Sequence, residues 1–311
     1  YMITSFFKTS KPIHYIIFSV VLTALSFYQR TFAVNFDSNL LNYLNELAYL
    51  FVLIASLFTV IFIVTKNNLT QNNSFAALFF CLFIGVSPQV LEHTSTLISN
   101  LFILFSLRRI LSLKNKTNIK KKLLDASLWI CLATLFDSFS FFFFAPLIIG
   151  IALYSVFEIK NILIPFCGVL VFGILWAAFN LVVHSQLPIL SDKLPDISFD
   201  MRNLVIQNNT LFTLFIAAVL LCGIVNYFLS GSFNNRQKRP SILLLILITT
   251  VGFIAFLFSQ SESKEVYVFI VAPSAILMAN FSETTKFSWI TDVIIVSLFV
   301  LSAIQIPFNI S

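Results

Sequence analysis

Charged residues in this chain occupy short polar gaps between long apolar runs, and the sign of the charge alternates from one gap to the next. The gaps around Glu92 and Asp137 carry acids and no lysine or arginine. The gap 108–122 is the opposite, because it is strongly basic and has no acid: Arg108, Arg109, Lys114, Lys116, Lys120, Lys121 and Lys122. Lysine and arginine are retained on the cytoplasmic side of membrane proteins. The alternation therefore predicts a chain that crosses a bilayer many times.

Composition supports the same prediction. Of 311 residues, 59% are hydrophobic and 10% are charged, whereas soluble domains carry about 25% charged residues. This balance excludes a soluble globular protein. The net charge of +6 is interpreted as contact with anionic lipid headgroups at the inner leaflet, and we expect no nucleic-acid partner. The four cysteines, Cys81, Cys131, Cys167 and Cys222, all lie in apolar runs and predict packing rather than disulfides.

A membrane-spanning helix needs about 20 apolar residues. By this criterion residues 1–311 form one all-α integral membrane domain with about eleven transmembrane helices, within a range of nine to eleven because several are short. The candidate spans are 13–33, 47–64, 75–90, 97–113, 124–136, 139–157, 162–183, 211–229, 241–259, 266–280 and 288–306. A cytoplasmic N-terminus places all but four basic residues on the inner side: Arg30, Lys193, Arg202 and Lys264. We expect a multi-pass protein of the bacterial inner membrane.

Three stretches follow one another in a recognisable layout. They are Asn35-Phe36-Asp37 with Asn42-Tyr43 after the first span, Ser87-Pro88 ahead of the basic gap and of Pro146, and Lys264-Glu265-Val266-Tyr267 ahead of Ala272-Pro273. Together they resemble the C-type polytopic glycosyltransferases, the GT-C fold, over about residues 30–300. The resemblance implies transfer of a sugar from a polyprenyl-phosphate donor at the periplasmic face. The length of the chain and its N-terminal residues also resemble a family of Bacteroidota inner-membrane proteins. That resemblance implies no activity.

The chain departs from the GT-C pattern at two positions. It has Ser99-Asn100 where many members carry an acid, and Asp137-Ser138 where many carry a lysine or arginine. We also expect no large outer domain of the kind with which many members hold their acceptor. The alternative function is therefore a non-catalytic membrane subunit of a cell-envelope complex, with another protein as its partner. If the chain is instead a glycosyltransferase, we expect membrane lipids, including polyprenyl phosphate, as its ligands.

Asp37 is the candidate catalytic residue, because sugar transfer needs a base near the acceptor hydroxyl and a carboxylate at the outer surface can serve. The alternative is that Asp37 caps the following helix. Arg30 and Lys264 are candidates for binding the lipid phosphate, Arg30 through its planar guanidinium. The alternative for both is that the charge reaches the headgroups from a helix end.

Three further residues are accessory candidates. Glu92 and His93 form an acid–imidazole pair at the outer end of a span; the alternative is a solvated loop. A metal site of His93 with His184 is the weaker reading, and we expect neither metal nor cofactor. Asp137 lies between aromatic residues at a helix end, where the helix dipole disfavours a negative charge. It needs a water-filled cavity, a cationic partner such as Arg30 or Lys264, or placement at the interface.

Overall fold

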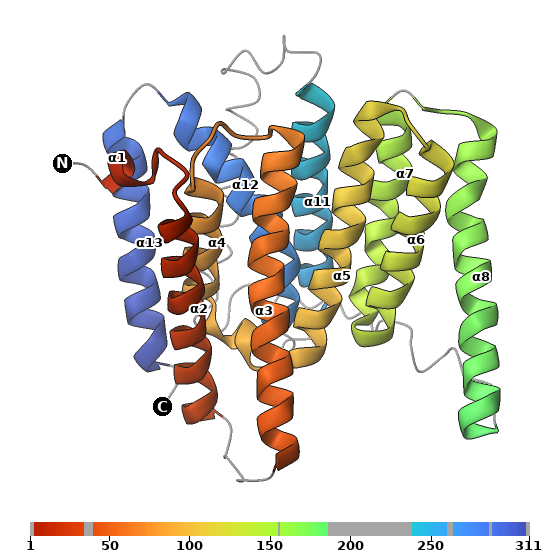
Figure 1. Ribbon diagram of the computed structural model, residues 1–311, viewed down its shortest axis with the longest axis horizontal. Helices are drawn as coiled ribbons and strands as arrows, with labels where there is room; N and C mark the ends of the chain where they lie inside the picture. The colour runs from red at the N-terminus through yellow and green to blue at the C-terminus, as the bar shows by residue number, and fades with distance from the viewer. Residues whose placement is uncertain are drawn as a thin grey trace.

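The computed structural model describes residues 3–33, 40–154, 156–185, 238–259, 264–285 and 288–308, and within these ranges the chain forms helices and no strand (Figure 1). The elements are α1 (Ile3–Phe7), α2 (Pro12–Ala33), α3 (Leu40–Asn67), α4 (Phe75–Val86), η1 (Pro88–Leu91), α5 (Thr94–Leu111), η2 (Ser112–Asn115), α6 (Ile119–Phe136), η3 (Ser138–Phe143), α7 (Phe144–Leu153), α8 (Ile159–His184), α11 (Arg239–Phe258), η5 (Lys264–Tyr267), α12 (Val268–Thr284) and α13 (Ser288–Phe308).

Long helices lie side by side; successive helices from α2 to α8 run in opposite directions, and so do successive helices from α11 to α13 (Figure 1). The α4 helix packs against α12 and α13, α12 packs against α11, and α5 packs against α3 and α6. The α8 helix stands at one edge of the bundle, where it packs against α6 and α7. Within the described ranges, six helices are long and apolar enough to cross a membrane: α2, α3, α5, α8, α11 and α12. An all-α architecture with several membrane-length helices is therefore confirmed.

Ten of the eleven predicted spans coincide with helices of the bundle, and the span 211–229 lies outside the described residues. The number of crossings and the cytoplasmic N-terminus stay predictions. The structure corrects the boundaries of two short spans. The span 124–136 is extended by residues 119–123, so that α6 has 18 residues, about 27 Å. The span 75–90 contains a helix of only 12 residues, α4.

The short length of α4 has a structural reason. Eleven of its twelve residues are buried, because α12, α13, α2 and α3 surround it. A helix of 12 residues spans about 18 Å, which is less than the roughly 30 Å of hydrocarbon. Since α4 meets protein rather than lipid, it does not need the full length. By contrast, α2, α3, α8 and α13 carry large exposed apolar side chains, as expected of helices that face acyl chains.

The two ends of the bundle differ in their content of lysine and arginine, whereas acids lie at both ends. The basic end, at which α2, α6 and α8 begin and α3 and α5 finish, carries Lys8, Lys11, Lys66, Arg108, Arg109, Lys114, Lys116, Lys120, Lys121, Lys122, Lys160, Lys238 and Arg239. It also holds a smaller number of acids: Asp125, Glu158, Glu283 and Asp292. The acidic end, opposite, carries Glu46, Glu92, Asp137 and Glu265, together with Arg30, His93 and Lys264. The segregation of lysine and arginine predicted from the sequence is thus present in the described part of the fold.

Candidate functional site at the acidic end

A proline turn brings Glu92 and His93 to the acidic end. The α4 helix stops at Val86 because Pro88 has no N–H to continue it, and because a residue before proline avoids the helical region. Ser87 accordingly has φ −129° and ψ 68°. Pro88 then begins η1, and an extended residue, His93, precedes the first turn of α5.

Glu265 reaches the same place from the other half of the chain. It lies in η5, whose neighbouring residues Val266 and Tyr267 are buried. The Tyr267 ring stacks on Phe256 of α11, with 4.3 Å between the ring centroids. These apolar contacts fix η5 against the bundle. As a result, the Glu265 carboxylate is directed toward the start of α5.

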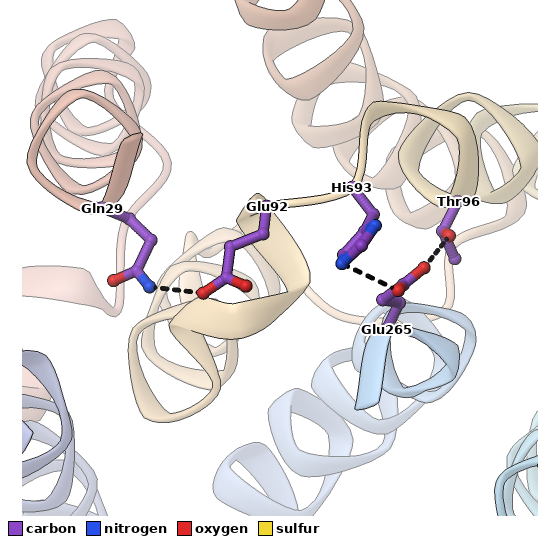
Figure 2. Close-up of polar contacts among 5 residues, drawn as sticks. All are labelled: Gln29, Glu92, His93, Thr96 and Glu265. Carbon is purple, nitrogen blue, oxygen red and sulfur yellow. Dashed lines mark hydrogen bonds and ion pairs between the residues drawn. The ribbon is translucent and has the colours of Figure 1, made fainter. Parts of the chain in front are cut away.

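Both oxygens of the Glu265 carboxylate are engaged (Figure 2). The Oε1 atom lies 2.8 Å from His93 Nε2, and the Oε2 atom accepts a hydrogen bond of 2.9 Å from Thr96 Oγ1. Thr96 is buried, whereas the His93 side chain is 49% exposed and that of Glu265 is 21% exposed. The group is therefore anchored inside the bundle and opens to solvent through the imidazole.

Asp137 belongs to the same group. It lies between α6 and η3 in extended conformation, and its Oδ1 accepts the Phe139 N–H at 2.9 Å, which caps η3. Burial raises the pKa of Asp137 to about 6, the Phe139 hydrogen bond opposes this rise, and the Glu265 charge adds to it. The Thr96 hydroxyl also opposes the rise in pKa. Its one proton is donated to Glu265, so Asp137 and Glu265 both depend on the polar surroundings of Thr96.

A second polar contact ties α2 to the turn. The buried Gln29 donates from Nε2 to Glu92 Oε1 over 2.8 Å (Figure 2). Gln29 is the residue directly before Arg30 in α2. The contact therefore places the Arg30 backbone beside the turn that carries Glu92 and His93.

Polar side chains continue from this group into the bundle along α5. Ser99 Oγ lies 2.5 Å from Ser140 Oγ and donates to the Ala133 carbonyl at 3.0 Å. Asn100, four residues after Thr96, is buried, and its Nδ2 has no hydrogen-bond partner among the described residues. A buried donor without a partner costs about 1–3 kcal/mol. An acceptor atom from water or a ligand would remove this cost.

Of the predicted accessory residues, His93 and Asp137 both lie near Glu265. Glu92 accepts from Gln29 instead, so Glu92 and His93 do not form the predicted acid–imidazole pair (Figure 2). The backbones of Arg30 and Lys264 lie in α2 and η5 at the same end, but their side chains are outside the described part. Asp37 lies outside the described residues altogether.

One expectation about partners is corrected. His93 pairs with Glu265 and not with His184, which ends α8 at the edge of the bundle. Within the described ranges no group of three or more His, Cys, Asp or Glu side chains is placed to hold a metal ion. For Asp137, the neighbouring charge that the structure describes is the acid Glu265. The side chains of Arg30 and Lys264 lie outside the described part, so a cationic partner for Asp137 stays a prediction.

Sequence reasoning missed Glu265, Thr96 and Gln29 as site residues. Glu265 lies within the Lys264–Tyr267 stretch, in which the sequence predicts a role for Lys264 alone. The signal that could have found it is an acid at the outer end of a span directly beside a basic residue. Thr96 and Gln29 have no such signal, because neutral polar residues at helix ends are common.

A carboxylate that holds an imidazole suits proton transfer. A hydrogen bond from Nε2 to Glu265 leaves His93 Nδ1 as the acceptor nitrogen, and a half-exposed imidazole can meet a substrate hydroxyl.

No protein-family model, curated protein or solved structure matches the chain.

Proposed function

We propose that this chain is a GT-C-like protein of the bacterial inner membrane that transfers a sugar from a polyprenyl-phosphate donor at the periplasmic face. The observation that carries the proposal is the meeting of His93, Glu265 and Asp137 at the acidic end, beside the backbones of Arg30 and Lys264. The distribution of lysine and arginine supports the orientation, since the basic end is then cytoplasmic.

Sugar transfer needs a base and a cation, and the acidic end offers candidates for both. The acceptor oxygen bonds to the anomeric carbon of the sugar, the bond from that carbon to the phosphate oxygen breaks, and the lipid phosphate leaves with the electron pair. The acceptor proton passes to His93 Nδ1, and Glu265 stabilises the imidazolium that forms. Arg30 in α2 and Lys264 in η5 are candidates for neutralising the charge of the leaving phosphate.

Asp37 is the second candidate for the base, by resemblance to the GT-C family. It follows α2 by four residues, so chain connectivity limits its distance from Arg30 and Gln29. The two candidates make different predictions. If Asp37 is the base, Asp37→Asn abolishes transfer while His93→Gln retains it; if His93 is the base, the reverse holds.

The first test is purification of the whole protein in mild detergent, followed by mass spectrometry of the lipids and proteins that accompany it. We expect polyprenyl phosphate to be enriched over the total membrane extract. A variant with Arg30→Gln and Lys264→Gln should lose this enrichment. A stoichiometric protein partner without polyprenyl lipid contradicts the transferase proposal and favours the envelope-subunit alternative.

The second test measures sugar transfer in vesicles from a radiolabelled polyprenyl-phosphate hexose. His93→Gln preserves a side-chain hydrogen-bond donor toward Glu265 but removes the basic nitrogen, so transfer should fall by about a hundredfold or more. His184→Gln is the matched control, because His184 is an exposed histidine at the end of α8. Transfer that survives His93→Gln at the native rate excludes the imidazole as the base.

The envelope-subunit alternative draws on one observation, the apolar flank of α8. This helix is little buried, and its exposed residues include Leu170, Ile174 and Val182. Acyl chains can cover this flank as well as a protein can. Co-purification in the first test separates the two.

A further inference from the structure

A cluster of cations lies at the basic end, far from the acidic-end residues. Arg108 Cζ is 4.4 Å from the centroid of the Phe62 ring, and Lys66 Nζ is 5.2 Å from the same centroid. Lys66 and Phe62 are four residues apart on α3, and Arg108 lies in the last turn of α5, which packs against α3. Two cations from two helices thus converge on one aromatic ring.

Two more cations adjoin this pair. Lys122 Nζ, in the first turn of α6 and ahead of the predicted span, donates to the Ser112 carbonyl at 2.6 Å. Burial, and then the charges of Arg109 and Lys66, lower the pKa of Lys122. Arg109 is bound to Asp125, with 2.9 Å between Nη2 and Oδ2. The group of Lys66, Arg108, Arg109 and Lys122, hereafter the cationic cluster, thus has one acid paired with it in the described part of the chain.

The cationic cluster has an excess of positive charge that packing alone does not explain. The charges of Arg109 and Lys66 act against that of Lys122, and repulsion between like charges is greater near low-dielectric hydrocarbon than in water. A cation–π contact with one phenylalanine ring stabilises the fold by only about 0.5–1 kcal/mol at an exposed site. An anion placed between Lys66 and Arg108 would remove the repulsion. The charge pattern therefore fits a bound anion.

An apolar stripe continues from the cationic cluster along the lipid-facing side of α3. Phe51, Phe58 and Phe62 are all exposed, and their spacing of seven and four residues puts them on one face of the helix. From Phe51 to Phe62 the helix rises about 16 Å, which is about half of the hydrocarbon thickness. A ligand that fits both parts has an anionic head and an acyl chain of one leaflet.

We propose that α3 and α5 together bind an anionic phospholipid, with its phosphate between Lys66 and Arg108 and an acyl chain along Phe62, Phe58 and Phe51. The guanidinium of Arg108 offers paired donors to two phosphate oxygens, and Lys66 adds a point charge. The site is independent of the proposed sugar transfer, because it lies at the opposite end of the bundle.

The test is native mass spectrometry of the whole protein in mild detergent, titrated with dioleoyl phosphatidylglycerol or dioleoyl phosphatidylcholine. We expect tighter binding of the anionic lipid. The double variant Lys66→Gln with Arg108→Gln should weaken it about tenfold or more, since each cation near a headgroup contributes on the order of a fivefold change. Inorganic phosphate in excess should not displace the lipid, because phosphate lacks the acyl chain.

The matched control is Lys120→Gln with Lys121→Gln, which removes the same charge from exposed positions of the basic end outside the cationic cluster. It should change lipid affinity by about twofold or less. An equal loss in both double variants means diffuse attraction to the basic end and overturns the proposal. Displacement by inorganic phosphate means a free-anion site and also overturns it. If the first variant unfolds on size exclusion, Arg108→Gln alone replaces it.

Discussion

At the scale of single residues, the acidic end shows how ordinary side chains acquire unusual protonation. Asp137 accepts one backbone N–H, that of Phe139, and lies near Glu265, to which the Thr96 hydroxyl donates. Partial burial and a neighbouring acid both favour its neutral form. A protonated Asp137 can donate a hydrogen bond, which an ionised one cannot. The site therefore changes its number of donors within a pH range that cells encounter.

Asp137→Asn tests this directly. Between the ordinary pKa of 3.8 and the raised value of about 6, the folded protein binds a proton that the unfolded chain has released, so stability falls as pH rises through this window. The asparagine variant imitates the protonated form. We expect it to be more stable than the native protein at about pH 7.5, by up to about 3 kcal/mol, and the gain to vanish toward about pH 4.

The measurement is thermal unfolding in detergent across this pH range. Glu158→Gln is the control, because Glu158 is exposed at the basic end, and it should follow the native profile. An asparagine variant that is less stable than the native protein at neutral pH means that Asp137 is ionised and paired with a cation such as Arg30 or Lys264. That result contradicts the neutral carboxyl.

At the scale of elements, one small residue sets the packing of α8. A Cβ atom on Gly168 would lie 2.0 Å from Ser127 Oγ and 3.0 Å from Ser127 Cβ. Glycine thus allows α8 to approach α6 closely, as small residues do between membrane helices. On the same helix, a Cβ on Gly173 would have no atom within 4 Å. The chain has 7 glycines, and nothing in the spacing of these two distinguishes them in the sequence.

Gly168→Ala should therefore separate α8 from α6 and destabilise the protein by about 1–3 kcal/mol. Gly173→Ala adds the same methyl group in open space and should leave stability unchanged or slightly raise it. Ser127→Ala in the Gly168→Ala background removes the closest clash and should restore part of the loss. Thermal unfolding in detergent measures all three. Equal effects of the two glycine variants would falsify the close contact.

At the scale of the whole molecule, the ends of the bundle differ in charge, and the direction in which they face decides the function. If the basic end is cytoplasmic, His93 and Glu265 face the periplasm, on the side where the proposed function needs its polyprenyl-phosphate donor. If the bundle is inverted, the proposed donor is on the wrong side. The cationic cluster binds anionic lipid in either orientation.

Cysteine labelling decides the orientation. With the four native cysteines replaced, Ser95→Cys marks the acidic end and Lys121→Cys the basic end, both at exposed positions. We expect a membrane-impermeant maleimide to label Ser95→Cys in intact cells and Lys121→Cys only after permeabilisation. The opposite pattern reverses the topology and removes the basis for a periplasmic active face.

The sequence by itself determined where the helices lie and which ends share a charge. Hydropathy and the retention of lysine and arginine are properties of each segment on its own, so ten predicted spans coincide with helices of the bundle. Glu92, His93 and Asp137 could be predicted as site residues from the sequence, because ionisable residues at the end of an apolar run stand out against their neighbours.

Only the tertiary structure decided which of these residues meet. Thr96 and Glu265 are 169 residues apart, and their contact depends on how α5, η5 and α12 pack. The apolar runs that form the lipid-facing α8 and the enclosed α4 look alike in sequence, since lipid and protein core are equally apolar. Which face of a helix is buried depends on the fit of side chains between helices. Local hydropathy does not predict that fit.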